Sequence, residues 1–219
     1  MGMVAAALGY RRPRRDMKEH ERAEREAKHR DLVERLGFAV RLDMGGVYMK
    51  DYHTIQTPQK VKNLPTRTLE LRQAKIGGKG SHREYYTDQF ATICLWKWPG
   101  ERGPTLNAIC ACLNKPVFAL YLGRKACPQA LPLQPCIEHA ARNWRDALDC
   151  ANKTYRECID DLLGYTLRED PPSRYFWEGN DHAGLEHHYV EDERWDQPAS
   201  RLRWQFQPRR EFMWSPTRE

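Results

Sequence analysis

The pattern of hydrophobic and polar positions predicts a mixed α+β fold. Residues 38–42, Phe-Ala-Val-Arg-Leu, alternate apolar and polar side chains, as expected for a strand with one buried face. Residues 90–96, Phe-Ala-Thr-Ile-Cys-Leu-Trp, give the strongest strand prediction because β-branched and aromatic side chains dominate them. Apolar side chains at helical spacing predict helices over about 106–113 and 137–163, and residues 209–214 are predicted to form a last strand.

The N-terminal part of the chain is predicted to form two helices, one apolar and one highly charged. Residues 3–8 are apolar and helix-favouring, and Gly9 can end that helix. Residues 10–35 are almost entirely charged, with opposite charges three or four positions apart, which supports a solvent-exposed helix. Residues 11–15, Arg-Arg-Pro-Arg-Arg, are the exception, because they concentrate one sign of charge and could contact phosphate.

A long polar excursion interrupts the predicted sheet. Residues 47–53 are predicted to continue the sheet after a turn at Gly45 and Gly46. Residues 54–82 then lose periodicity and gain proline and glycine, so we do not expect them in a core. Residues 50–86 contain eight Lys and Arg against three Asp and Glu, almost the whole excess behind the formal net charge of +6. This local excess favours a polyanionic partner.

The composition indicates the cellular compartment in which the protein is expected to work. The chain has seven cysteines, an odd number without a CxxC pair, which is typical of a reduced cytosolic protein. No apolar run approaches membrane-spanning length, and the N-terminus does not have the features of a signal peptide. We therefore expect a soluble, cytoplasmic protein.

Aromatic and basic side chains flank the polar excursion. Tyr52 and His53 stand at its entrance, and Arg83, Tyr85 and Tyr86 stand at its exit. Aromatic faces suit unpaired bases because stacking tolerates any base, while nearby cations suit phosphates. From spacing alone, a disordered basic loop between ordinary strand tyrosines is an equally good interpretation.

A second candidate lies in residues 121–128, Tyr-Leu-Gly-Arg-Lys-Ala-Cys-Pro. Gly123 would allow a backbone amide to approach a phosphate, and Arg124 and Lys125 would neutralise its charge. The simpler interpretation is an ordinary turn.

The sequence predicts no metal, no cofactor and no catalytic residue. His182, Glu186, His187 and His188 suggest a metal site, but neighbouring residues on a strand point to opposite faces, so His187 and His188 would not readily bind one ion. No GxSxG motif, Walker loop or paired-carboxylate motif is present.

Several short segments also occur in an order and spacing that resemble those of a known family. They are residues 38–43, 50–54, 83–85, 90–96, 113–117, 121–128 with Pro132 and Leu133, His187 with His188, and 210–212. Together they resemble the CasD-type subunit of type I-E CRISPR Cascade, a member of the RAMP superfamily, over most of the chain. Residues 121–128 are the most specific part of the resemblance.

The resemblance implies a fold. It is an α+β ferredoxin-like, RNA-recognition-motif-like (RAMP) sheet with helices on one face and a long β-hairpin thumb over 54–82. Residues 1–219 would form a single domain, completed by a C-terminal extension over 137–219. Family members begin with a strand and a Gly-rich segment that would precede Gly2, so the resemblance implies an N-terminally truncated sheet, for which a start codon assigned too late is the favoured explanation.

The resemblance also implies a function in antiviral defence. The protein would be a non-catalytic subunit that binds the 5′ handle of the crRNA, caps the Cascade backbone, and contacts the backbone subunit and the large subunit, reaching target DNA indirectly. We expect Tyr52, His53 and Tyr85 to stack or wedge against bases. The expected phosphate-binding and thumb-lining residues are Arg67, Lys75, Lys79, Arg83, Arg124 and Lys125.

Two alternatives stay open at this point. One is a metal-independent endoribonuclease that processes precursor crRNA, as a type I-C relative does with the kinds of residues found at Tyr52 and His53, where a histidine would act as a general base. The other is a protein-interaction adaptor whose charged helix, residues 14–35, docks a partner without contacting RNA. Steep salt dependence would favour a phosphate contact over apolar docking.

Overall fold

The structure is a computed structural model that separates into two compact units, unit 1 (Met1–Asp43 and Ala91–Glu219) and unit 2 (Met44–Phe90). The residues it describes are 1–58, 66, 68–69, 72, 76–100, 102–151, 174–185 and 189–216.

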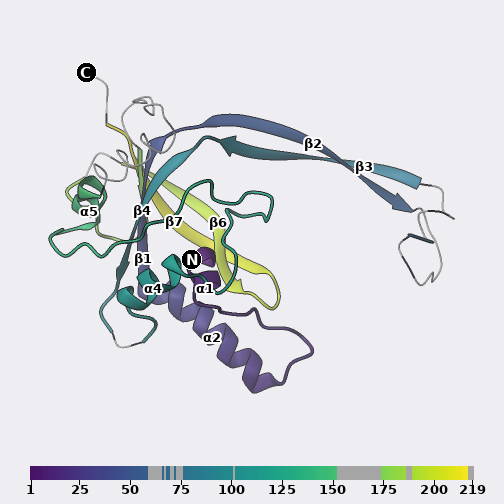
Figure 1. The fold of residues 1–219 in the computed structure, drawn as a ribbon, viewed down its shortest axis with the longest axis horizontal. Coiled ribbons are helices and arrows are strands. Elements are labelled where there is room, and N and C mark those ends of the chain that lie inside the picture. Colours follow the sequence, from purple (N-terminus) through teal and green to yellow (C-terminus); the bar gives the residue numbers. More distant parts are fainter. Residues whose placement is uncertain are drawn as a thin grey trace. The chain divides into compact units, whose positions relative to one another are not determined.

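Unit 1 is built on a five-stranded sheet with the strand order β4-β1-β5-β7-β6 (Figure 1). The strands are β1 (Leu36–Met44), β4 (Phe90–Lys97), β5 (Arg174–Trp177), β6 (Val190–Ser200) and β7 (Gln205–Trp214). β5 pairs antiparallel with β1 and with β7, and β6 pairs antiparallel with β7. A largely antiparallel sheet combined with helices confirms the predicted α+β class.

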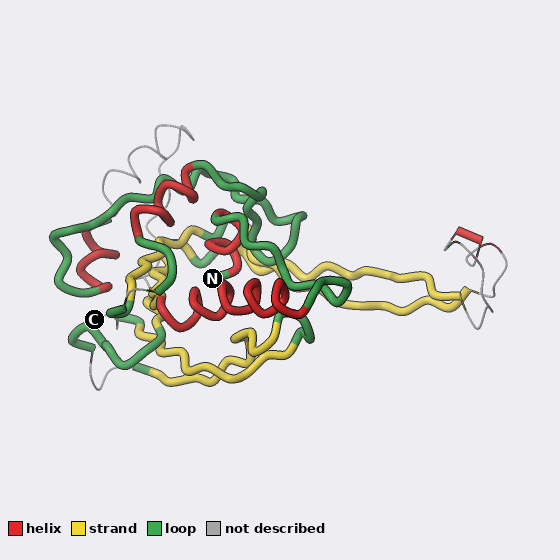
Figure 2. Tube along the Cα trace, turned by 90° about the horizontal axis from the view of Figure 1, so that it is seen from below, coloured by secondary structure: helices red, strands yellow, loops and turns green. Residues whose placement is uncertain are grey.

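Helices pack against both faces of this sheet, which corrects the expectation of helices on one face (Figure 2). They are α1 (Gly2–Ala7), α2 (Glu19–Arg35), α4 (Leu106–Asn114) and α5 (Trp144–Cys150). Because alternate strand residues point to opposite faces, β1 contributes to two clusters. Leu36 packs with side chains of α1, α2 and α4, whereas Ala39 packs with Trp144 and Leu148 of α5 and with the large side chain of Trp177.

Gly9 ends α1, as predicted. Its φ of 75° lies in the left-handed region, and its amide donates to the Ala6 carbonyl at 3.1 Å. The amide of Tyr10 donates to the Ala5 carbonyl at 2.8 Å. These two bonds form a Schellman motif, which glycine favours at this position. The chain therefore turns sharply before the basic segment of residues 11–15.

The charged helix α2 begins at Glu19, later than the prediction, which began at residue 10 or 14. Pro13 explains why the helix does not extend back to residue 10, because proline disfavours the helical conformation in the residue before it. Only His29 and Leu32 of α2 are buried, so most of its charged side chains face solvent, as predicted. Among the described residues, no helix has the length and apolar character needed to span a bilayer.

Unit 2 contains a long antiparallel β-hairpin. Its strands are β2 (Val47–Pro58) and β3 (Ile76–Thr87), paired from Val47 opposite Thr87 to Pro58 opposite Ile76. The prediction that residues 47–53 continue the main sheet is wrong, because β2 and β3 form a separate two-stranded sheet. Large polar and aromatic side chains on both faces of β2 explain this, since neither face suits burial in a core.

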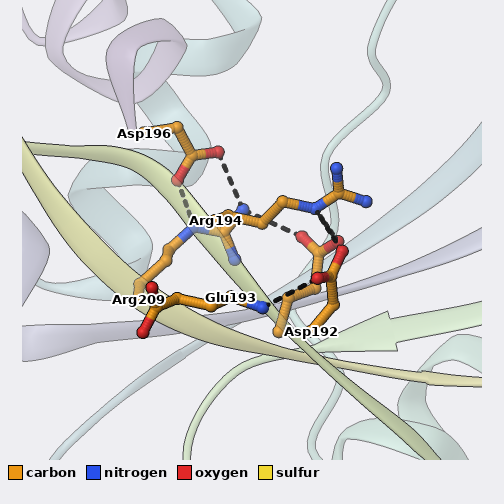
Figure 3. A network of polar contacts seen from close by, with 6 residues as sticks. Asp192, Glu193, Arg194, Asp196 and Arg209 are labelled. Atoms are coloured by element: carbon orange, nitrogen blue, oxygen red, sulfur yellow. Dashed lines mark hydrogen bonds and ion pairs between the residues drawn. The ribbon is translucent and has the colours of Figure 1, made fainter.

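Two strands and one boundary were also missed. β5 is short and lacks alternation, and β6 is charged on both faces, so neither gave a clear pattern. Ion pairs to β7 stabilise β6, including Arg209 to Asp196 at 2.6 Å (Figure 3) and Arg194 to Glu211 at 3.0 Å. The helix predicted over 137–163 begins only at Trp144, as α5; residues 137–143 are not helical, and residues 152–163 lie outside the described residues.

Candidate nucleic-acid interface

One face of the hairpin is aromatic and exposed. Directly opposed residues of an antiparallel pair share a face, and Tyr52 stands opposite His82 while Tyr48 stands opposite Tyr86. The ring centroids are 5.2 Å apart in the first pair and 5.7 Å apart in the second. We call this the aromatic face; its members are Tyr48, Lys50, Tyr52, Thr54, Gly80, His82, Glu84 and Tyr86.

Gly80 lets the Tyr52 ring lie across the neighbouring strand. A Cβ atom at position 80 would come within 2.3 Å of the Tyr52 hydroxyl oxygen. Tyr52 and Tyr86 are each 60% exposed, which leaves ring surface available to a stacking partner. The aromatic face is therefore a platform of preset rings and does not form part of a core.

Charges on the aromatic face are balanced. Lys50 stands opposite Glu84, and a hydrogen bond to the Glu84 carboxylate raises the pKa of Tyr48 above its usual value. The Tyr48 hydroxyl therefore stays protonated at neutral pH. This face offers rings and hydrogen-bond groups, with no local excess of positive charge.

The opposite face of the hairpin is ionic. We call it the ionic face; its described members are Val47, Met49, Asp51, His53, Ile55, Lys79, Ser81, Arg83, Tyr85 and Thr87. The His53 Nε2 atom contacts the Asp51 carboxylate, and the Cα of Arg83 stands directly opposite that of Asp51. Lys79 stands opposite Ile55, so no carboxylate lies directly across from it.

The structure does not bring the hairpin residues predicted to contact RNA together on one face. Tyr52 lies on the aromatic face, and the ionic face holds His53, Lys79, Arg83 and Tyr85. Tyr52 and His53, expected to act together, therefore point in opposite directions. Arg67 and Lys75 lie outside the described residues.

Sequence reasoning noted Tyr86 at the exit of the excursion but did not list it as an RNA contact, and it left out two further ring-bearing residues of the aromatic face, Tyr48 and His82. Tyr48 precedes Tyr52 by four positions, and His82 precedes Tyr86 by four, so each pair falls on one face of its strand. That spacing was visible in the sequence, but the pairing of the two strands was not.

Residues 121–128 form a tight turn in unit 1. Tyr121 and Pro128 form a single antiparallel bridge, and residues 118–122 do not form a regular strand. Gly123 has φ 75°, and the Arg124 amide donates to the Leu122 carbonyl at 2.9 Å, as in a γ-turn. That amide is already used within the turn, whereas the side chains of Arg124 and Lys125 are exposed.

Of the residues considered for a metal site, only His182 is described, and its contacts indicate a packing role. His182 stacks on Tyr189 with centroids 4.5 Å apart, and its Nδ1 accepts a hydrogen bond from Trp177 Nε1 at 3.3 Å. His182 is thus part of the aromatic core. Glu186, His187 and His188 lie outside the described residues, and among those described no group of three or more His, Cys, Asp or Glu is placed to hold a metal.

Comparisons with known proteins point to one family. The family model described as CRISPR-associated protein (Cas_Cas5) matches residues 1–212. No curated protein matches the chain. A chain of a solved structure described as a CRISPR RNA-guided surveillance complex is similar, with 22% identity, coverage of 98% of this chain and 75% of that chain, and a TM-score of 0.52. This likeness confirms the RAMP-type fold. A second structure, described as the crystal structure of a Cas protein, has 23% identity, coverage of 95% and 73%, and a TM-score of 0.46.

Proposed function

Because the chain belongs to the Cas5 family of CRISPR-associated proteins, we propose that it is a non-catalytic, CasD-type subunit of a type I-E Cascade complex, that it works in the cytoplasm, and that it binds the 5′ handle of the crRNA. Its protein partners would be the backbone subunit, whose row of copies it caps, and the large subunit. The exposed aromatic face of the hairpin is the observation that carries the RNA-binding part of this proposal.

The aromatic face suits unpaired bases. Tyr52 and His82 present a tilted pair of rings, and the exposed Tyr86 lies two pairs further along the same face, beyond Lys50 and Glu84. Stacking of one base on an aromatic side chain contributes about 1–3 kcal/mol and tolerates different bases. A hairpin that presents several rings along one face can therefore hold a single strand without reading its full sequence.

Phosphate contacts would come from cations elsewhere on the protein. Lys79 and Arg83 lie on the ionic face, and Arg124 and Lys125 lie at the turn in unit 1. Lys79 is the strongest candidate on the hairpin, because Arg83 faces the Asp51 carboxylate across the strands. Charge-assisted contacts to phosphate oxygens would fix the path of the strand while the rings hold its bases.

The arrangement of Tyr52 and His53 favours a non-catalytic role. An endoribonuclease that used both side chains would need them to converge on one ribose. They lie on opposite faces of β2, and His53 contacts Asp51 on its own face. We therefore expect no cleavage of a repeat RNA hairpin; specific cleavage that is lost in His53→Ala would overturn this part of the proposal.

Co-purification tests the proposal as a whole. The chain is co-expressed with the neighbouring CRISPR-associated proteins and a guide RNA, and the complex is isolated through a tag on another subunit. We expect the wild-type chain and Thr54→Ala, a control on the same face without a ring, to join an RNA-containing complex. Tyr52→Ala/Tyr86→Ala should lower the fraction of complex that holds the chain and protects the 5′ end of the RNA. Equal assembly and protection by all three forms would contradict the role of the aromatic face, and absence of every form from the complex would favour the adaptor alternative.

A further inference from the structure

A basic pocket lies in unit 1, apart from the residues assigned to RNA binding above. Its volume is about 210 Å³, and its lining residues are Gly9, Tyr10, Arg11, Arg25 and Lys28. A water molecule occupies about 30 Å³ of liquid, so the pocket has room for a group of several heavy atoms. Three of the five lining residues are cationic.

The fold holds the wall of this pocket in place. The Schellman motif at Gly9 directs the chain from α1 into residues 10–12. Arg25 Nη1 of α2 donates to the Arg12 carbonyl at 3.2 Å, and the Arg12 guanidinium lies 4.5 Å above the ring of Trp204. The segment that carries Arg11 is thus fixed both to α2 and to the turn between β6 and β7. A prearranged site loses less conformational freedom when a ligand binds.

The cations around the pocket are poorly balanced by carboxylates. Lys28 pairs with Glu24 at 2.7 Å, but within the described part of the chain no carboxylate forms an ion pair with Arg11, Arg12 or Arg25. Next to the pocket, burial and then the charge of Arg12 lower the pKa of Arg201, so Arg12 and Arg201 lie close enough to repel each other. An anion in the pocket would be attracted by the cations that line it.

The donors around the pocket suit a phosphate group. A guanidinium presents planar pairs of N–H donors that match two oxygens of a phosphate, and an ammonium adds a compact charge. Burial raises the pKa of Tyr10, so its hydroxyl also remains a donor at neutral pH. We propose that this pocket binds a backbone phosphate of a nucleic-acid strand. This site goes beyond the hairpin and the 121–128 turn, and it gives unit 1 a second phosphate contact.

Charge-matched variants of the full chain test the proposal. Arg11→Gln/Lys28→Gln removes two charges from the pocket, while Arg22→Gln/Arg30→Gln removes two charges from α2 at positions that do not line it. The probes are fluorescently labelled single-stranded RNA and single-stranded DNA of the same sequence, titrated over a series of salt concentrations. Loss of this one phosphate contact should make the slope of log K against log salt shallower by about 0.7, the contribution of one contact for single strands. We expect at least a fivefold loss of affinity for the pocket variant and less than a twofold loss for the control.

The results for the pocket and hairpin variants distinguish failure of the pocket proposal from failure of the proposed function. A loss with both probes supports a phosphate contact that ignores the sugar, and a loss with one probe identifies whether RNA or DNA supplies the phosphate. Equal behaviour of the pocket variant and the control with both probes overturns the proposal. Lys79→Gln/Arg83→Gln, measured in parallel, reports on the hairpin alone, so a loss there with an unchanged pocket variant refutes the pocket and leaves the hairpin in place. If the double pocket variant melts earlier than wild type, Lys28→Gln alone repeats the test, because this side chain is exposed.

Discussion

Tyr52 and His82 lie directly opposite each other on the hairpin, with their ring centroids 5.2 Å apart, on its exposed aromatic face. The next residue along the strand, His53, points to the other face and contacts Asp51. Two adjacent aromatic residues that look equivalent in the sequence are therefore expected to differ in function.

Substitution of these neighbours should separate their roles. Tyr52→Ala is expected to weaken guide-RNA binding by about 1–3 kcal/mol, or roughly 5- to 150-fold, because one stacking platform is lost. His53→Ala should have a much smaller effect, since its ring is held beside Asp51 on the ionic face. Competition binding with labelled RNA measures both. A larger loss for His53→Ala than for Tyr52→Ala would show that the ionic face is the one that contacts bases.

Gly37 should tolerate no side chain. A Cβ atom there would lie 2.2 Å from Cε2 of Trp96, which packs against the core cluster around Trp177. Gly37→Ala is expected to lower the free energy of unfolding by about 1–3 kcal/mol through overpacking. Urea denaturation measures this, with Gly45→Ala as the control because a Cβ there meets nothing within 4 Å. Partial recovery in Gly37→Ala/Trp96→Leu would identify Trp96 as the cause, and equal stability of Gly37→Ala and Gly45→Ala would contradict the predicted clash.

The buried ion pair on β1 should show strong coupling. Arg41 Nε donates to Asp43 Oδ1 at 2.7 Å, and both side chains are almost completely buried. Arg41→Met removes the guanidinium that balances the buried Asp43 charge, while Thr92 Oγ1 still donates to Asp43 Oδ2 at 2.7 Å. The loss of the ion pair is expected to cost about 3–5 kcal/mol. Arg41→Met/Asp43→Leu should be less destabilised than Arg41→Met alone. A double variant as unstable as the sum of the two single ones would show that the residues act independently.

His29 should make the protein sensitive to acid. Burial, with smaller contributions from the charges of Arg201 and Arg12, lowers its pKa below the usual 6.5. The unfolded chain therefore binds this proton more readily than the folded chain, so stability is fully present above pH 6.5 and is lost as the pH falls through the folded pKa. Denaturation across this range should show a flatter acid limb for His29→Leu than for wild type. The exposed His139 provides the control, and an identical acid limb in His29→Leu and His139→Gln would contradict the assignment.

Strands and helices whose own apolar residues recur at regular spacing could be predicted from the sequence. β1 alternates clearly, and α4 combines helical apolar spacing with the Thr105 side chain, which accepts a hydrogen bond from the Ala108 amide at 3.2 Å. β6 could not be predicted in this way, since its polar side chains are stabilised by partners on β7, such as Glu211 for Arg194. Such pairings depend on strand contacts that no local pattern reveals.

The same limit applies to the candidate site. The sequence placed aromatic and basic side chains at both ends of the polar excursion, and the structure brings Tyr52 close to β3. Which residues share a face depends on the register between β2 and β3, and a slip of one residue would move every side chain of one strand to the other face. The long segment between the two strands leaves that register undetermined at the level of sequence.

Photo-crosslinking of the assembled complex tests the central claim most directly. The chain is purified with its partner subunits and a guide RNA, irradiated, digested, and analysed by mass spectrometry for peptides that carry nucleotides. The account predicts crosslinks from the 5′ portion of the RNA to the aromatic face, at Tyr52, His82 or Tyr86. Crosslinks confined to unit 1, with none on β2 or β3, would contradict the proposal that the hairpin holds the guide RNA.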